Sequence, residues 1–172
     1  MTHKSDTICA LATAYGQSGI GVIRVSGPLS RFIAKKILHK DLESRYAYYG
    51  AFFDDDSHVI DKGVAIVFPG PNSYTGEDVV EISCHGSPYI QQKIITSFLG
   101  VGILPAQAGE FTLRAYLNKK MDLSQAEAVA DIIASENEAA HALAMQQLRG
   151  CISKNRDLLR QQLIEFKALI EL

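Results

Sequence analysis

An arginine stands inside an otherwise apolar strand pattern near the start of the chain. Arg24 lies in GIGVIRVSG, residues 19–27, and period-two alternation places it on the same face as Ile20 and Val22. A guanidinium in such surroundings needs an acceptor, because a charged side chain is rarely buried unless it is paired. Arg24 therefore predicts one of two arrangements, an internal ion pair or a bound anion.

A second charged residue, Glu81, lies in the strand pattern expected over residues 79–84. Alternation places Glu81 and His85 on a polar face and Cys84 on an apolar face. Glu81 is thus a candidate for the floor of a pocket. Cys84 and His85 are adjacent, but neighbouring strand residues point to opposite faces, so they cannot act as a nucleophile and its base. We expect Cys84 to be a core residue.

The stretch GQSGIGVIRVSG, residues 16–27, contains four glycines and raises the question of a phosphate-binding loop. Its spacing is G-x-x-G-x-G, a strand pattern rather than a helix follows it, and no Lys-Ser or Lys-Thr is present. The stretch therefore predicts a glycine-rich turn between two strands. No P-loop pattern occurs elsewhere in the sequence.

A pair of lysines, Lys119 and Lys120, closes the helix expected within EFTLRAYLNKK, residues 110–120. Lysines at this end complement the partial negative charge of a helix C-terminus. The same ammonium groups are also suited to an anion, so the residues alone leave both interpretations open.

No residue pattern predicts a metal site. The three adjacent acids at 54–56 lack the spacing and the closing glutamate of an EF-hand, and they indicate a turn. Cys9, Cys84 and Cys151 are far apart and match no metal-binding spacing. They are typical of free thiols in a reducing compartment.

Composition and charge narrow the class of protein. The 172 residues are 47% apolar and carry a formal net charge of −2, so a core can form but nothing attracts nucleic acid in general. Any RNA contact would be a local patch or would lie outside these residues. The sequence has neither a signal-peptide run nor an apolar stretch of membrane-spanning length, and we expect a soluble cytoplasmic protein without membrane contact.

The elements that position these residues change in character near Met121. Before it, strand and helix patterns follow one another in the order β-β-α-β-β-β-α-α, and after it no segment has a strand pattern. The sequence therefore predicts an α+β domain over residues 1–120 and the first helices of a helical domain over residues 121–172.

Two capping boxes mark the predicted helical domain. Ser124-x-x-Glu127 predicts a helix over about 125–134, and Ser135-x-x-Glu138 predicts one from about 136 to the end, with Gly150 as its weak point. The sequence stops at Leu172 on the apolar stripe of this helix. We expect either that the chain was cut inside a larger protein or that another chain covers this end.

Three motifs together closely resemble the N-terminal region of the MnmE (TrmE) family of tRNA modification GTPases. They are DTICALAT…GIGVIRVSG, FPGPNSYTGEDVVEISCHGSP and AGEFTLRAYLNKKMDLSQAEAVADII, and the resemblance covers nearly the whole sequence. It implies a mixed-sheet tetrahydrofolate-binding domain, similar to those of the glycine-cleavage aminomethyltransferase and dimethylglycine oxidase. It also implies a homodimer that binds 5-formyltetrahydrofolate or another tetrahydrofolate.

The resemblance further implies a role in tRNA modification. With the flavoprotein MnmG, the family adds a carboxymethylaminomethyl or aminomethyl group to C5 of the wobble uridine of certain tRNAs, using a folate-derived carbon. A GTPase domain that uses GTP, Mg²⁺ and K⁺ is inserted in the family's helical domain. The present residues hold no Walker A lysine, no guanine-reading motif and no C-terminal cysteine motif. We expect them to bind folate and dimerise, with no catalytic residue of their own and no GTP hydrolysis.

The family's folate contacts match three residues of this sequence. They are Arg24 in GVIRVSG, Glu81 in EDVVEISCHG and Lys120 in YLNKKMDL. A carboxylate can accept the paired amino and ring N–H donors of a pterin, while arginine or lysine suits the carboxylates of the folate tail. Which charged residue meets which end is open.

Two other functions are compatible with the same residues. A free-standing folate-dependent one-carbon transferase would need an acid or base, for which Asp78, Glu81 and His85 are candidates. A dimerisation scaffold without ligand would instead use Arg24 and Glu81 as an internal ion pair.

Overall fold

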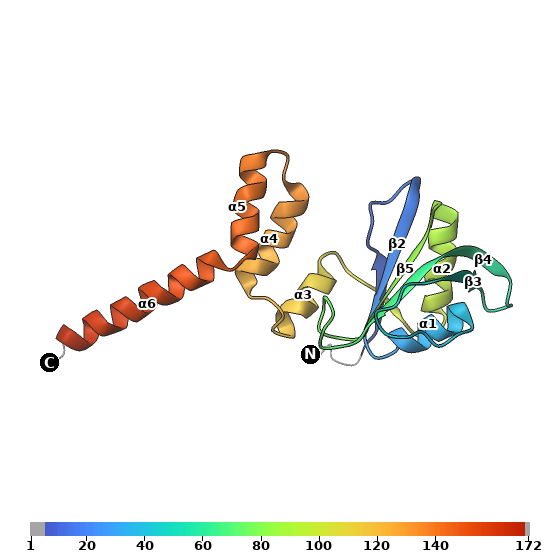
Figure 1. Cartoon of the computed structure of the whole chain (residues 1–172), viewed down its shortest axis with the longest axis horizontal. Coiled ribbons are helices and arrows are strands. Elements are labelled where there is room, and N and C mark those ends of the chain that lie inside the picture. The colour runs from blue at the N-terminus through green and yellow to red at the C-terminus, as the bar shows by residue number, and fades with distance from the viewer. Residues whose placement is uncertain (1–5, 171–172) are drawn as a thin grey trace. The chain divides into compact units, whose positions relative to one another are not determined.

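The computed structural model describes residues 6–170, which form two compact units (Figure 1). The first unit ends at Phe111 and the second begins at Thr112. The first contains a β-sheet with helices and the second is entirely helical in its described residues. The predicted α+β domain followed by helices is therefore confirmed.

The first unit is built on one mixed sheet of six strands, in the order β3-β4-β5-β2-β1-β6. All neighbouring strands are antiparallel except β1 and β6, which are parallel. The strands are β1 (Ile8–Leu11), β2 (Ser18–Ser26), β3 (Tyr48–Phe53), β4 (Val59–Phe68), β5 (Val79–Gly86) and β6 (Leu104–Pro105). The sequence did not predict β6, because two residues are too few to show an alternating pattern.

Two helices, α1 (Ser30–Leu38) and α2 (Pro88–Leu99), pack on one face of this sheet. The core joins Ile33 and Ile37 of α1 and Ile94 of α2 to alternate strand residues such as Ile23 and Ile82, all nearly inaccessible. Burial of these apolar side chains is the main source of stability for the unit. Helix α1 begins at Ser30 with Leu29 as its N-cap.

The opposite face of the sheet carries the residues predicted to do chemistry. Arg24 of β2 and Glu81 of β5 lie there, in register, with Ala10 of β1 beyond Arg24 and Ile66 of β4 beyond Glu81. The alternation predicted for both strands is confirmed, since Val80, Ile82 and Cys84 are buried on the helical side while Glu81 and Ser83 are half-buried. We call this second face, which α1 and α2 do not cover, the outer face.

Four helices belong wholly or partly to the second unit. They are α3 (Glu110–Leu117), α4 (Leu123–Ala134), α5 (Glu138–Leu148) and α6 (Cys151–Ile170). Figure 1 shows α4 and α5 side by side, and two glutamines tie them together. Gln125 Nε2 donates to the Leu148 carbonyl at 2.8 Å, and Gln147 Nε2 donates to the Ser124 carbonyl at 3.0 Å.

The predicted helix starts and the predicted long helix need correction. Asp122, not Ser124, caps α4, in a capping box completed by Gln125. Asn137 caps α5, and the long helix is divided at Gly150, whose φ of 76° lies in the left-handed region. In the part of the chain that the structure describes, no helix is long and apolar enough to cross a bilayer.

Candidate functional site

The centre of the candidate site is an ion pair between two neighbouring strands. Arg24 and Glu81 stand directly opposite each other in the β2–β5 register. Arg24 Nε donates to Glu81 Oε1 at 2.8 Å, and Arg24 Nη2 lies 2.7 Å from the same oxygen. The side chains are 23% and 28% exposed, so the pair is shielded but reachable from solvent. The structure therefore brings together two of the three predicted folate contacts.

The printed contacts of this pair converge on one carboxylate oxygen. Arg24 Nε and Arg24 Nη2 lie 2.8 and 2.7 Å from Glu81 Oε1. A carboxylate offers about four acceptor positions, so a half-buried glutamate paired with one arginine can still accept hydrogen bonds from a ligand.

Two aromatic rings flank the guanidinium of Arg24. Its Cζ atom lies 4.9 Å from the ring centre of Tyr74 and 5.5 Å from that of Phe111. Both distances are within the range of a cation–π interaction. Tyr74 belongs to the loop between β4 and β5, and Phe111 is the last residue of the first unit. Sequence reasoning did not single out either ring, although Tyr74 lies in the long motif FPGPNSYTGEDVVEISCHGSP.

The loop that carries Tyr74, residues 69–78, is fixed by polar contacts. The hydroxyls of Ser26 and Thr75 are 2.7 Å apart and fully buried, and Ser26 Oγ also donates to Glu77 Oε2 at 2.7 Å. At the base of the loop, the Gly70 amide donates to Asp78 Oδ1 at 2.9 Å. A buried hydroxyl pair is costly to break, so this loop has one well-defined conformation next to Arg24.

Lys120, the third predicted contact, lies in the second unit just after α3. Its amide donates to the Ala115 carbonyl at 2.8 Å, while the Lys119 amide donates to Tyr116 at 2.9 Å with Lys119 at a φ of 58°. This is a Schellman ending with lysine where glycine is usual. An open pocket of about 530 Å³ is lined by Tyr116, Leu117, Lys119, Lys120, Met121, Asp122 and Gln125. That Lys120 joins Arg24 and Glu81 in one site stays a prediction.

The residues Cys84 and His85 do not form a catalytic pair. His85 instead approaches Asp61, whose Oδ1 lies 2.7 Å from His85 Nδ1 and whose Oδ2 accepts the His85 amide at 2.8 Å. Burial alone raises the pKa of Asp61, but these bonds outweigh it and hold the pKa below its ordinary value. Cys84 is buried, and burial raises the pKa of its thiol to about 11, as expected for a core residue.

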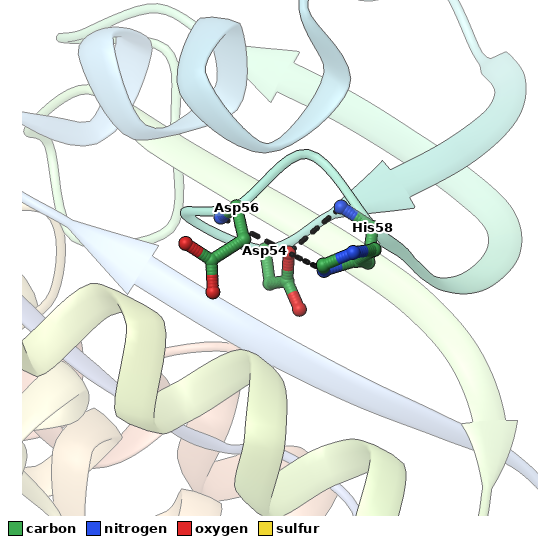
Figure 2. Close-up of side chains that lie close together, drawn as sticks. All are labelled: Asp54, Asp56 and His58. Carbon is green, nitrogen blue, oxygen red and sulfur yellow. Dashed lines mark hydrogen bonds and ion pairs between the residues drawn. The ribbon is translucent and has the colours of Figure 1, made fainter.

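The acidic turn expected at residues 54–58 is confirmed, and Figure 2 shows its three ligand-type side chains, Asp54, Asp56 and His58, close together. Asp54 Oδ1 accepts the amides of Asp56 and His58 at 3.2 and 2.8 Å, and Lys93 Nζ lies 2.9 Å from Oδ2. The hydrogen bond from Lys93 lowers the pKa of Asp54. Oδ1 of Asp54 thus closes the β3–β4 turn, and Oδ2 ties this turn to α2 through Lys93.

Comparison with known proteins identifies the family of this chain. A family model described as "GTP-binding protein TrmE N-terminus" matches residues 7–120, two thirds of the chain. The chain belongs to this family. A second model, described as "MnmE helical domain", matches residues 123–172. The resemblance expected from the motifs is therefore confirmed for both parts of the sequence.

Several curated relatives of this family member carry the name tRNA modification GTPase MnmE. The protein of Flavobacterium johnsoniae is 51% identical over 98% of the chain, and that of Parabacteroides distasonis is 50% identical over 96%. The protein of Ectopseudomonas mendocina is 44% identical over 99%. The chain spans about 38% of the length of each of these relatives.

Proposed function

We propose that this chain is the folate-binding and dimerising module of a tRNA modification GTPase. Arg24, Glu81 and Lys120 hold 5-formyltetrahydrofolate or another tetrahydrofolate. The proposal rests chiefly on one observation, a half-buried ion pair on a mainly apolar strand face. Arg24 and Glu81 face each other there with side chains 23% and 28% exposed, and the carboxylate has acceptor positions beyond those that one arginine uses.

The chemistry of a tetrahydrofolate suits the charged residues. The pterin ring presents an exocyclic amino group beside a ring N–H, and a carboxylate is the natural acceptor for such donors. The glutamate tail carries carboxylates, which the ammonium group of Lys120 suits. Lys120 lines a pocket whose walls include the apolar side chains of Leu117 and Met121, which fits an amphipathic ligand.

The outer face of the sheet supports the dimer. A solvated sheet face is normally polar, yet this one carries Val22, Val64 and Ile66 beside Tyr49, which is 70% exposed. A second copy of the chain would cover these side chains.

Sedimentation equilibrium tests whether this face forms the dimer interface. Val64→Glu is expected to weaken self-association, while Val59→Glu, at the exposed start of β4, leaves it unchanged. Equal association of both variants would place the interface elsewhere.

The proposal extends to the activity of the complete protein. With MnmG, it adds a carboxymethylaminomethyl or aminomethyl group to C5 of the wobble uridine of certain tRNAs, in the cytoplasm. Folate supplies the carbon, and a GTPase domain outside these residues uses GTP, Mg²⁺ and K⁺. The present residues contain no P-loop pattern, so GTP hydrolysis is assigned to that domain.

Calorimetric titration of the chain with 5-formyltetrahydrofolate tests the binding role. Binding is expected for the wild type and is lost in Arg24→Ala and Glu81→Ala, with the fold retained by circular dichroism. Lys35→Ala is the matched control, since Lys35 of α1 forms an exposed ion pair with Asp41 at 2.7 Å. No heat of binding for the wild type would refute the proposal.

One observation favours a second candidate function. Arg24 and Glu81 already satisfy one another in part, as they would in a dimerisation scaffold without ligand. The same titration separates the two functions, because a scaffold binds no folate and its ion-pair variants lose only stability. A one-carbon transferase would instead show folate-dependent turnover by this chain alone.

A further inference from the structure

The outer face of the sheet changes from covered to open along its strands. At one end, Ser26 of β2 and its cross-strand partner Val79 of β5 are buried, although α1 and α2 pack on the other face. Two positions further along, Arg24 and Glu81 are half-buried, and at the far end Ile20 is exposed. The ion pair therefore lies where the covered part of this face meets the open part.

The loop between β4 and β5, residues 69–78, covers Ser26. Thr75 of this loop is fully buried, and its hydroxyl lies 2.7 Å from the hydroxyl of Ser26. Because Ser26 and Arg24 are two positions apart on one strand, their side chains lie on the same face. The loop thus lies on the outer face beside the ion pair, with the ring centre of Tyr74 4.9 Å from the central carbon of Arg24.

Three hydrogen bonds hold this loop in a closed cycle that can run in only one direction. An ionised carboxylate can only accept, so Ser26 Oγ donates to Glu77 Oε2 at 2.7 Å. This bond uses the single hydroxyl proton of Ser26, so the Thr75 hydroxyl donates to Ser26. Thr75 Oγ1 in turn accepts the Glu77 amide at 3.2 Å. The cycle starts and ends on Glu77, and bonds linked in this way strengthen one another.

We propose that Ser26, Thr75 and Glu77 are positioning residues of the folate site. Their hydrogen-bonded cycle fixes loop 69–78 as a preformed wall beside Arg24. Ordering a loop during binding subtracts from affinity, and a loop that is already ordered avoids this cost. The inference rests on the proposed folate-binding function. It adds residues that act on the ligand through the loop, without contacting the ligand themselves.

Calorimetric titration with 5-formyltetrahydrofolate compares the wild type with Thr75→Val and Thr75→Ser. Valine keeps the shape of threonine but removes two bonds of the cycle, whereas serine keeps the hydroxyl. The Kd is expected to rise by about fivefold to tenfold in Thr75→Val and to stay within about twofold in Thr75→Ser. Thr96→Val is the matched control, because it makes the same exchange at an exposed position of α2, on the other face of the sheet.

A fluorescent reporter measures the order of the loop independently of affinity. The sequence contains no tryptophan, so Tyr74→Trp places a single indole on the loop. The acrylamide quenching constant of this indole is expected to rise when Thr75→Val is added and to stay unchanged when Thr96→Val is added. Equal quenching in the two double variants would show that the cycle does not hold the loop.

The titrations separate this inference from the proposed function. A folded Thr75→Val variant that binds as tightly as the wild type, with only its stability to urea reduced, overturns the positioning role and leaves folate binding intact. Equal weakening in Thr75→Val and Thr75→Ser also overturns it. If circular dichroism shows that Thr75→Val does not fold, Ser26→Ala carries the same expectation, since it removes the donor to Glu77. Absence of binding by the wild type overturns the proposed function and this inference together.

Discussion

Replacing Glu81 with glutamine removes the charge of the site while preserving its shape. The amide oxygen of the variant still accepts from Arg24, which holds Oε1 through contacts of 2.8 and 2.7 Å. The amide nitrogen then takes the place of Oε2. It is a donor and faces the N–H groups that the wild-type carboxylate would accept. The variant therefore reverses the polarity of the atom that we propose meets the pterin.

The magnitude follows from the difference between charged and neutral hydrogen bonds. A bond to a charged partner contributes about 1.5–3 kcal/mol, and a neutral bond about 0.5–1.5 kcal/mol. Losing the charged acceptor for two ligand donors costs about 2–3 kcal/mol, which corresponds to roughly 30- to 150-fold in Kd. The loss of folding stability is smaller, about 1 kcal/mol, because Arg24 keeps a neutral acceptor.

Titration calorimetry with 5-formyltetrahydrofolate measures the change in affinity, and urea unfolding measures the change in stability. Lys35→Gln is a suitable control, since it neutralises one member of an exposed ion pair on α1. It should change neither quantity appreciably. A Glu81→Gln variant that binds within threefold of the wild type would show that this carboxylate does not face the ligand.

Three further predictions concern the rest of the chain. Because burial raises the pKa of Cys9 and Cys84 to about 11, iodoacetamide at pH 8 should modify the exposed Cys151 in the folded protein and leave these two intact, as read by mass spectrometry. Lys119→Gly should raise stability to urea by up to about 1 kcal/mol, since the left-handed φ of 58° penalises a side chain, whereas Lys119→Ala should give no gain. Burial alone raises the pKa of Asp61, but accepted hydrogen bonds hold it below its ordinary value, so its stabilisation is present above about pH 4 and is lost as the pH falls further. The unfolding free energies of wild type and Asp61→Asn should therefore differ at pH 7 and converge toward pH 3.

The two charged residues at the centre of the site were predictable because each interrupts an alternating strand pattern. Their partnership was not, because Arg24 and Glu81 are 57 positions apart and only the β2–β5 register places them opposite one another. Alternation gives the face on which a residue lies, but it says nothing about the strand beside it. The sequence therefore left both the ion pair and the ligand anion open as interpretations of Arg24.

The predicted start of α4 in the second unit was wrong for a local reason. The segment DLSQAE, residues 122–127, contains two overlapping capping patterns, Asp122-x-x-Gln125 and Ser124-x-x-Glu127. Both supply a side-chain acceptor and a long polar partner three positions later. Propensity does not distinguish them. The helix that forms begins earlier, and its Gln125 also reaches the last carbonyl of α5, a contact available only once the two helices pack.

The ion pair itself bears on the choice between a ligand site and a scaffold. Arg24 and Glu81 occupy the middle of a row that continues into Ala10 and Ile66, where aliphatic side chains would pack without the cost of desolvating two charges. A partly buried ion pair therefore contributes little to stability alone. A pterin edge would supply further donors to the carboxylate, and ligand binding would then stabilise the folded chain in proportion to the logarithm of the ligand concentration. The cost of desolvating Arg24 and Glu81 is thus a disadvantage in a scaffold, whereas a ligand site requires these charges.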